Sequence, residues 1–205
     1  MKVLISNAVW GEKYCSVFTT ASLASLLADG NIPGLSKRAS ITFHIVTTLR
    51  DRPRLEADAA VARLREYCAI EWEVAENFAV YSPPTGHGGE KYPFLSALQN
   101  IAIERAIGHD VIVFNYADFI WADGSLASTI DMISQDRPRP DAVLAFCLPV
   151  DRDAALPALE KYRQSRNPTA VTLSPRNGAK IAIERMHREA RNSYWDSPGF
   201  TNLPS

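Results

Sequence analysis

The sequence has few cysteines, and their spacing fits no known pairing. Only Cys15, Cys68 and Cys147 are present, far apart and inside apolar segments. An odd number at wide spacing gives neither a disulfide framework nor a metal-binding or redox motif. We therefore expect three reduced thiols packed in the core of a cytoplasmic protein.

Long hydrophobic runs and an excess of one charge are also missing. The longest apolar stretch, around residues 142–150, is far shorter than the roughly 20 residues that cross a bilayer. Asn7, Glu12 and Lys13 interrupt the first apolar run, so no signal peptide is predicted. A net charge of −1 gives no basic surface for nucleic acid. A soluble, cytoplasmic chain is expected, whose partners are small molecules or other proteins, and the oligomeric state stays open.

Several phosphate-binding and catalytic motifs are absent. No G-x-G-x-x-G follows the first predicted strand, and neither G-x-x-x-x-G-K-[ST] nor G-x-S-x-G occurs. These absences argue against a dinucleotide oxidoreductase, a P-loop enzyme and an α/β-hydrolase.

Strand-like and helical segments alternate along the 205 residues. Short apolar, β-branched runs predict strands at residues 2–8, 41–48, 70–75, 111–116, 142–148 and 170–173. Helical spacing and capping residues predict helices at 14–28, 51–68, 94–107, 124–134, 151–162 and 175–190. This order predicts one α/β domain over residues 1–205, a three-layer sandwich with a mostly parallel central sheet, ending in an irregular tail at 191–205.

Residues 110–128 combine a buried-looking strand with two acids and a helix start. Asp118 would emerge just beyond the carboxyl end of the strand, where open α/β sheets bind ligands. Asp123 precedes Gly124 and Ser125 and can cap the following helix. Because Asp123 has a sufficient structural role and Asp118 does not, a functional interpretation depends mainly on Asp118.

Four segments resemble the nucleotide-diphospho-sugar transferases of the glycosyltransferase A fold. They are VWGEKY at residues 9–14, SLLADGNIPGL at 25–35, LSALQNIAIERAIG at 95–108 and VIVFNYAD at 111–118. Members of that family commonly carry two acids separated by one residue at the strand end. This chain has Tyr116, Ala117 and Asp118 there, so only the second acid is present, and the acceptor-binding region of many members is short or missing.

The resemblance implies a divalent cation that neutralises the departing nucleoside diphosphate. Hard oxygen ligands suit Mn²⁺ or Mg²⁺, and Asp118 is the candidate metal ligand. His187, in a late segment that also resembles the family, is the second candidate. The alternatives are a solvated loop acid for Asp118 and a surface histidine for His187.

Substrate-binding residues are expected at the strand ends and on the helix that precedes the acidic strand. Residues at the end of the first strand lie at the carboxyl edge of the sheet and could hold a base, and the resemblance implies that those after the second strand contact the nucleoside. Thr47 and Asp51 belong to the latter group, and Asp51 also has an interpretation as a helix N-cap. The complete set is Asn7, Val9, Trp10, Thr47, Asp51, Lys91, Asn100 and Tyr116.

Each of these residues also has a structural explanation. Trp10 is equally expected as core packing, and Asn100 as a helix-surface residue. Lys91 closes a glycine-containing stretch, residues 83–91, that could cover a diphosphate or simply be a mobile surface loop.

The expected reaction is transfer of a sugar from a nucleoside diphosphate sugar, a UDP-sugar in the first instance, to an unidentified hydroxyl acceptor. An inverting enzyme needs a carboxylate that deprotonates the acceptor. Asp123 and Asp151 are the candidate catalytic residues, although both can cap helices. The alternative is a non-catalytic nucleotide-sugar-binding or protein-interaction module on the same scaffold.

Overall fold

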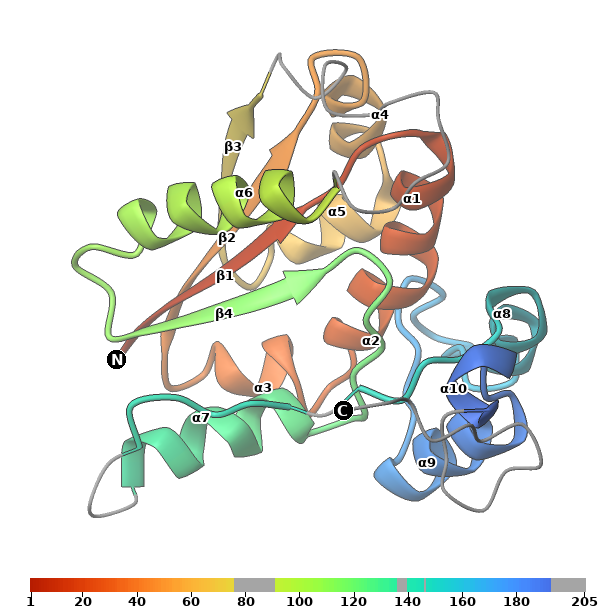
Figure 1. Cartoon of the computed structure of the whole chain (residues 1–205). Coiled ribbons are helices and arrows are strands. Elements are labelled where there is room, and N and C mark those ends of the chain that lie inside the picture. Colours follow the sequence, from red (N-terminus) through yellow and green to blue (C-terminus); the bar gives the residue numbers. More distant parts are fainter. Residues whose placement is uncertain (76–90, 136–139, 146, 193–205) are drawn as a thin grey trace, which may run out of the picture.

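The centre of the molecule is a parallel sheet. The computed structural model describes residues 1–75, 91–135, 140–145 and 147–192. Within them, β1 (Lys2–Ala8), β2 (Ser40–Thr47), β3 (Ala69–Val74) and β4 (Val111–Tyr116) pair in the order β3-β2-β1-β4, all parallel (Figure 1). The predicted α/β class and parallel sheet are confirmed.

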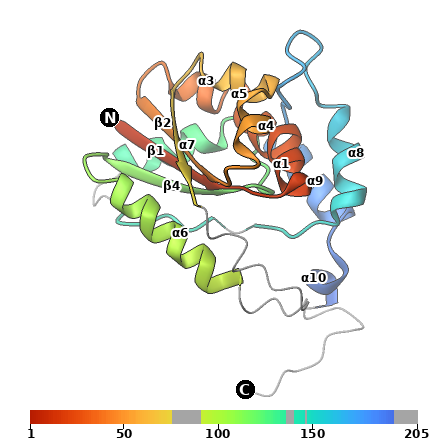
Figure 2. The same cartoon turned by 90° about the horizontal axis from the view of Figure 1, so that it is seen from above.

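Helices cover both faces of this sheet, as a three-layer sandwich requires (Figure 2). On one face, Ile5 and Ile45 pack with Phe18 and Leu23 from the first helical region. On the other, Val46 packs with Leu98 of α6 (Lys91–Arg105). Being covered on both faces, β1 reads as a nearly continuous apolar run rather than an alternating one.

Two predicted helices are interrupted. The first comprises α1 (Glu12–Val17), a π-helical turn η1 (Phe18–Ser22) and α2 (Leu23–Leu26), and the short α3 (Ile32–Leu35) follows. The second, predicted as one helix over residues 51–68, is divided into α4 (Arg52–Glu56) and α5 (Ala59–Leu64). The division occurs because Asp58 begins a new helix, its side chain accepting a hydrogen bond from the Ala60 N–H.

The carboxyl-terminal part is attached through a second, smaller apolar cluster. Its helices are α8 (Arg152–Glu160), α9 (Pro175–Glu184) and α10 (Arg188–Asn192), and α7 (Ser125–Gln135) precedes them. Leu159 and Ile181 pack there against Val17 and Ala24 of the first helical region. Asp151 caps α8 and Ser174 caps α9, accepting from the N–H groups of Ala154 and Asn177.

The predicted strand at 142–148 is wrong for the residues of it that are described. Residues 142–145 and 147–148 form no strand, and Val150 makes only an isolated antiparallel bridge with Met186. The strand predicted at 170–173 is likewise reduced to a bridge between Val171 and Arg163.

The late helix predicted over residues 175–190 is interrupted at the Met186 bridge, and α10 continues to Asn192, into the predicted tail. Residues 193–205 lie outside the described residues, so the tail remains a prediction. None of the helices within the described ranges combines the length and apolar character needed to span a membrane.

Candidate functional site

The candidate site lies at the carboxyl edge of the sheet, between β1 and β4. From β1 the chain proceeds to β2 and β3 on one side, whereas β4 lies on the other side of β1. The carboxyl ends of β1 and β4 therefore lie side by side at the edge where open parallel sheets bind ligands, and the helices that follow both strands pack on the same face. Trp10 and Gly11 follow β1 here, and Ala117 and Asp118 follow β4.

Asp51 joins the loops that follow β1 and β2. Its Oδ2 accepts hydrogen bonds from the Gly11 backbone N–H at 2.8 Å and from the Thr48 hydroxyl at 2.8 Å. Gly11 has φ +77°, a conformation that favours glycine. Asp51 is only 9 % exposed and makes no side-chain cap to α4, so the predicted side-chain cap is wrong. Its carboxylate instead fixes the β1 loop over the end of β2.

The loop after β4 is held by buried polar side chains of the first helical region. Ser22 Oγ donates to the Tyr116 carbonyl at 3.1 Å, and the Trp121 backbone N–H donates to Ser25 Oγ at 2.9 Å. Asn115 accepts from Trp121 Nε1 and donates to Asn7 Oδ1, both at 2.8 Å. The position of this loop is therefore set by partners roughly 90 residues away in sequence.

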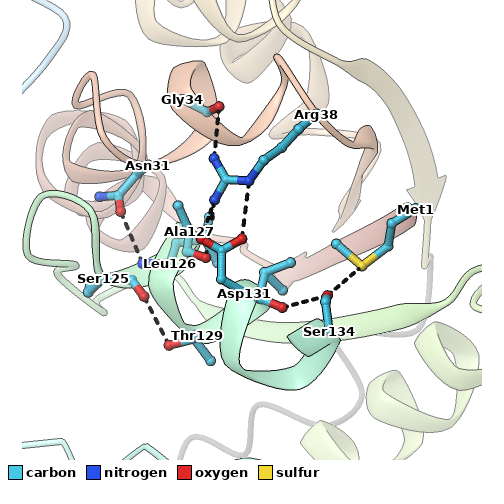
Figure 3. Close-up of polar contacts among 11 residues, drawn as sticks. Met1, Asn31, Gly34, Arg38, Ser125, Leu126, Ala127, Thr129, Asp131 and Ser134 are labelled. Atoms are coloured by element: carbon cyan, nitrogen blue, oxygen red, sulfur yellow. Dashed lines mark hydrogen bonds and ion pairs between the residues drawn. The ribbon is translucent and has the colours of Figure 1, made fainter. Parts of the chain in front are cut away.

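Asp123 belongs to the same anchoring system and does not cap α7. Its Oδ1 accepts from the Gly30 N–H at 2.8 Å, while the Leu126 N–H of α7 donates to Asn31 Oδ1 at 3.1 Å (Figure 3). A Cβ added at Gly30 would lie 2.7 Å from Asp123 Oδ1, so only glycine fits. The predicted capping role is thus taken by Asn31, a residue that sequence reasoning missed because it is remote from α7 in sequence.

Asp118 differs from Asp51 and Asp123 in being exposed. Its carboxylate makes no hydrogen bond or ion pair with any residue within the described ranges. Desolvation raises the pKa of the Cys147 thiol, and the negative charge of Asp118 raises it further. Cys147 is itself exposed, contrary to the expected core packing, whereas Cys15 is buried.

His187 approaches the same short segment from the other direction. Its backbone N–H donates to the Pro149 carbonyl at 3.0 Å, two residues beyond Cys147. The side chain is 44 % exposed, and its Nδ1 accepts from the Glu189 N–H at 3.3 Å, at the start of α10. His187 is therefore joined to Pro149 through the backbone, and the described part of the chain contains no group of three metal-binding side chains.

The predicted substrate-binding residues are divided between core and surface. Asn7, Val9 and Thr47 are fully or almost fully buried. Asn7 Nδ2 and Thr47 Oγ1 are buried and have no hydrogen-bond partner within the structure's described ranges. These are costly groups to leave unsatisfied, and they lie at the carboxyl ends of β1 and β2.

The other predicted residues lie on or near the α6 side. Trp10 packs beside Val46 and Leu98, and the Tyr116 hydroxyl accepts from Gln99 Nε2 at 2.8 Å. Asn100 is exposed on α6. Lys91 begins α6, but the placement of its side chain, like all of residues 83–90, lies outside the described residues.

Concave regions are found elsewhere on the molecule. A cavity of about 20 Å³ lies between the sheet and α6, beside Ser6 and Leu98, and has room for about one water molecule. A more open groove of about 360 Å³ lies between α5 and residues 166–169. Neither is lined by Asp118, so the candidate site is defined by topology and side-chain chemistry.

Sequence reasoning also missed a polar chain across the α6 face of the sheet. Ser6 Oγ lies 3.1 Å from His44 Nδ1, and His44 Nε2 lies 3.3 Å from Glu73, which also accepts from Arg105 of α6 at 3.1 Å. Burial lowers the pKa of His44, so the ring is neutral. A carboxylate only accepts, so Nε2 carries the proton and Ser6 donates to Nδ1. The sequence did hold a signal for this chain of contacts, because Ser6 and His44 are polar residues within the otherwise apolar strands β1 and β2.

Comparisons with protein-family models, with curated proteins and with solved structures found no match.

Proposed function

We propose that the carboxyl edge between β1 and β4 binds a nucleoside diphosphate sugar, a UDP-sugar in the first instance, and that the protein transfers the sugar to a hydroxyl acceptor on a glycosyltransferase A-like scaffold. The observation that carries this proposal is the exposed carboxylate of Asp118, which has no hydrogen bond or ion pair among the described residues and follows β4 at the carboxyl edge of a parallel sheet. The buried, unsatisfied Asn7 Nδ2 and Thr47 Oγ1 near the same edge also support it.

Asp118 can supply one hard oxygen ligand, which does not make a metal site by itself. An Mn²⁺ or Mg²⁺ ion would therefore arrive with the diphosphate, whose oxygens and waters supply the other ligands. Such an ion neutralises the negative charge of a departing nucleoside diphosphate. The role of the protein is then to hold Asp118 at a fixed place, which the anchoring of Tyr116 and Trp121 achieves.

The two candidate bases both have structural partners. Asp123 uses Oδ1 for the Gly30 N–H, and its Oδ2 makes no hydrogen bond among the described parts of the chain. Asp151 uses Oδ1 to cap α8. Of the two, Asp123 follows the same strand as Asp118 and keeps an oxygen available, so it is the better candidate for deprotonating an acceptor.

A non-catalytic nucleotide-sugar-binding module is the second candidate. Among the described residues, Asp118 is the one acid in the loop after β4 that has no hydrogen bond or ion pair, and both candidate bases have structural uses, which favours this module. It predicts the same donor binding without turnover.

A thermal-shift screen of nucleoside diphosphates with and without Mn²⁺ tests both versions, because a ligand that binds the native state raises the apparent stability. We expect at least one diphosphate to raise the melting temperature only when Mn²⁺ is present. Hydrolysis of the matching sugar donor then separates the versions, since a transferase releases sugar slowly to water and a binding module releases none. If no diphosphate shifts the melting temperature, both versions are wrong.

A further inference from the structure

The open groove beside α5 has the size of a small-molecule site. Its volume is about 360 Å³, within the range of roughly 300–1,000 Å³ that is usual for ligand pockets. One wall is α5 with the turn that follows it, and the other wall is the loop at residues 166–169. The described residues that line the groove include none of the candidate nucleotide site. The groove therefore has room for a small molecule of its own.

Both walls of the groove hold an arginine with unused donors. Arg166 is exposed and makes no hydrogen bond or ion pair within the described ranges. Arg63, on α5, lies over the Tyr67 ring at 5.1 Å and donates to Glu66. Its Nε has no hydrogen-bond partner among the residues described, although a guanidinium has five N–H donors to satisfy. Arg63 therefore keeps donor capacity beyond its ion pair with Glu66.

The rest of the lining is partly apolar and partly polar. Ala59, Ala62 and Pro168 present apolar surface to the groove. Asn167 Oδ1 accepts from Thr169 Oγ1 at 2.6 Å, and Asn167 Nδ2 makes no hydrogen bond with any described residue. The groove can therefore contact an organic group on one side and a hydrogen-bond acceptor on the other.

Both walls are held in place without a ligand. Val61 and Leu64 are fully buried and fix α5 in the main core. On the other wall, Arg163 donates to the Pro168 carbonyl at 3.0 Å and to the Thr20 carbonyl at 3.1 Å. A groove that is formed in advance loses little free energy to ordering when a ligand binds.

The charges in the groove select an anion. Arg63 and Arg166 supply two positive charges, and Glu66 is the one acid in the described lining. The hydrogen bond to Glu66 raises the pKa of Arg63, and the charge of Asp29 raises it further, so two acids act on Arg63 and none on Arg166. Two guanidinium groups on opposite walls approach an anion from different directions, which suits a tetrahedral phosphate better than a planar carboxylate held by one fork.

We propose that this groove binds a small phosphate monoester, with the phosphate between Arg63 and Arg166 and the organic part against the apolar surface of α5. On binding, Arg63 would exchange the Glu66 carboxylate for the phosphate, so Glu66 is an internal competitor of the ligand. This second site goes beyond nucleotide-sugar binding and does not depend on it.

Titration of phenyl phosphate into the full chain tests the proposal, with amide and arginine side-chain NMR signals as the readout. We expect the largest shifts on α5 and residues 166–169, and none there with phenol, which lacks the charge. Arg166→Gln should weaken binding about tenfold, because it removes a charged donor. Arg176→Gln is the matched control, at an exposed arginine of α9 outside the groove, and should leave the affinity unchanged. Glu66→Gln should strengthen binding about threefold, the worth of an exposed ion pair.

Four outcomes would overturn the proposal. Phenyl phosphate could shift no signals of the groove, or Arg166→Gln and Arg176→Gln could weaken binding equally, which would indicate unspecific attraction between charges. Inorganic phosphate could bind as tightly as phenyl phosphate, so that the groove would make no use of an organic part. Weaker binding to Glu66→Gln would show that Glu66 supports the ligand rather than competing with it.

Discussion

Two carboxylates lie at the same carboxyl edge of the sheet, one after β2 and one after β4, but one is buried and the other is exposed. Asp51, after β2, is buried and accepts two hydrogen bonds at 2.8 Å, whereas Asp118, after β4, is exposed and makes no such contact within the described chain. The difference arises from the adjacent loops: Gly11 and Thr48 direct donors at Asp51, and the β4 loop is anchored through Ser22, Ser25 and Asn115 instead. Position at a strand end therefore does not decide whether an acid stabilises the fold or is free to bind.

Asp51→Ala should have the largest effect on stability. It removes a charged acceptor and leaves the Gly11 N–H without a partner in a mostly buried place, a loss of about 2–4 kcal/mol. Urea unfolding measures this loss in the free energy of unfolding. The matched variant Asp118→Ala should change the free energy of unfolding by less than about 0.5 kcal/mol, as exposed positions do. Equal losses in the two variants would contradict the comparison.

Gly30→Ala should cost about 1–3 kcal/mol, because the new methyl group would meet Asp123 Oδ1 and the Gly124 backbone within 3 Å. Gly178→Ala is the control: its Cβ would make only ordinary contacts with Leu173, and alanine is the better helix former. Gly178→Ala should therefore be neutral or stabilising. A Gly30 variant that unfolds like the wild type would show that Asp123 does not depend on Gly30.

His44 should make stability fall in mildly acidic solution. Its pKa in the folded protein is lowered by burial from the ordinary 6.5, so below that pH the unfolded chain binds a proton that the folded chain resists. This contribution is present above pH 6.5 and is lost as pH falls toward the folded pKa. His44→Gln should unfold with a shallower pH slope between pH 7 and 5. An unchanged slope would show that other groups cause the loss.

The smallest expected effect is on the labelling rates of two cysteines, Cys15 and Cys147, whose thiol pKa values are influenced by Asp51 and Asp118. Burial raises the pKa of Cys15 to about 11, with Asp51 contributing, whereas the exposed Cys147 is influenced by Asp118. Asp118→Asn should therefore raise the rate of iodoacetamide labelling at Cys147, by less than about tenfold, because a larger fraction is thiolate. Cys15 should stay unlabelled in the folded protein. Peptide mass spectrometry follows both sites, and an unchanged Cys147 rate would place Asp118 away from it.

The sequence predicted well what depends on local patterns. The four paired strands and the capping of α8 and α9 by Asp151 and Ser174 follow from apolar runs and N-cap residues. It failed where distant partners compete with local ones. Asp123 is next to a helix start, yet it binds Gly30, and Asn31 caps α7 from 95 positions away in sequence.

The strand predicted at 142–148 illustrates a different limit. A pattern of apolar, β-branched residues indicates strand propensity, but a strand also needs a paired neighbour, and the described residues of this stretch form no hydrogen bond with β4. For the candidate site, the sequence singled out Asp118 among the acids. It did not separate the buried Asn7 and Thr47 from exposed candidates such as Asn100, because burial depends on the whole packing.

The most direct test of the central claim is calorimetric titration of UDP in the presence of Mn²⁺ into the wild type, Asp118→Asn and Asp153→Asn. Asp153 is an exposed acid on α8, so its variant makes the same charge change away from β4. We predict Mn²⁺-dependent binding to the wild type and to Asp153→Asn, and at least a tenfold weaker affinity for Asp118→Asn. Equal affinity in all three proteins would contradict the assignment of Asp118 to the site.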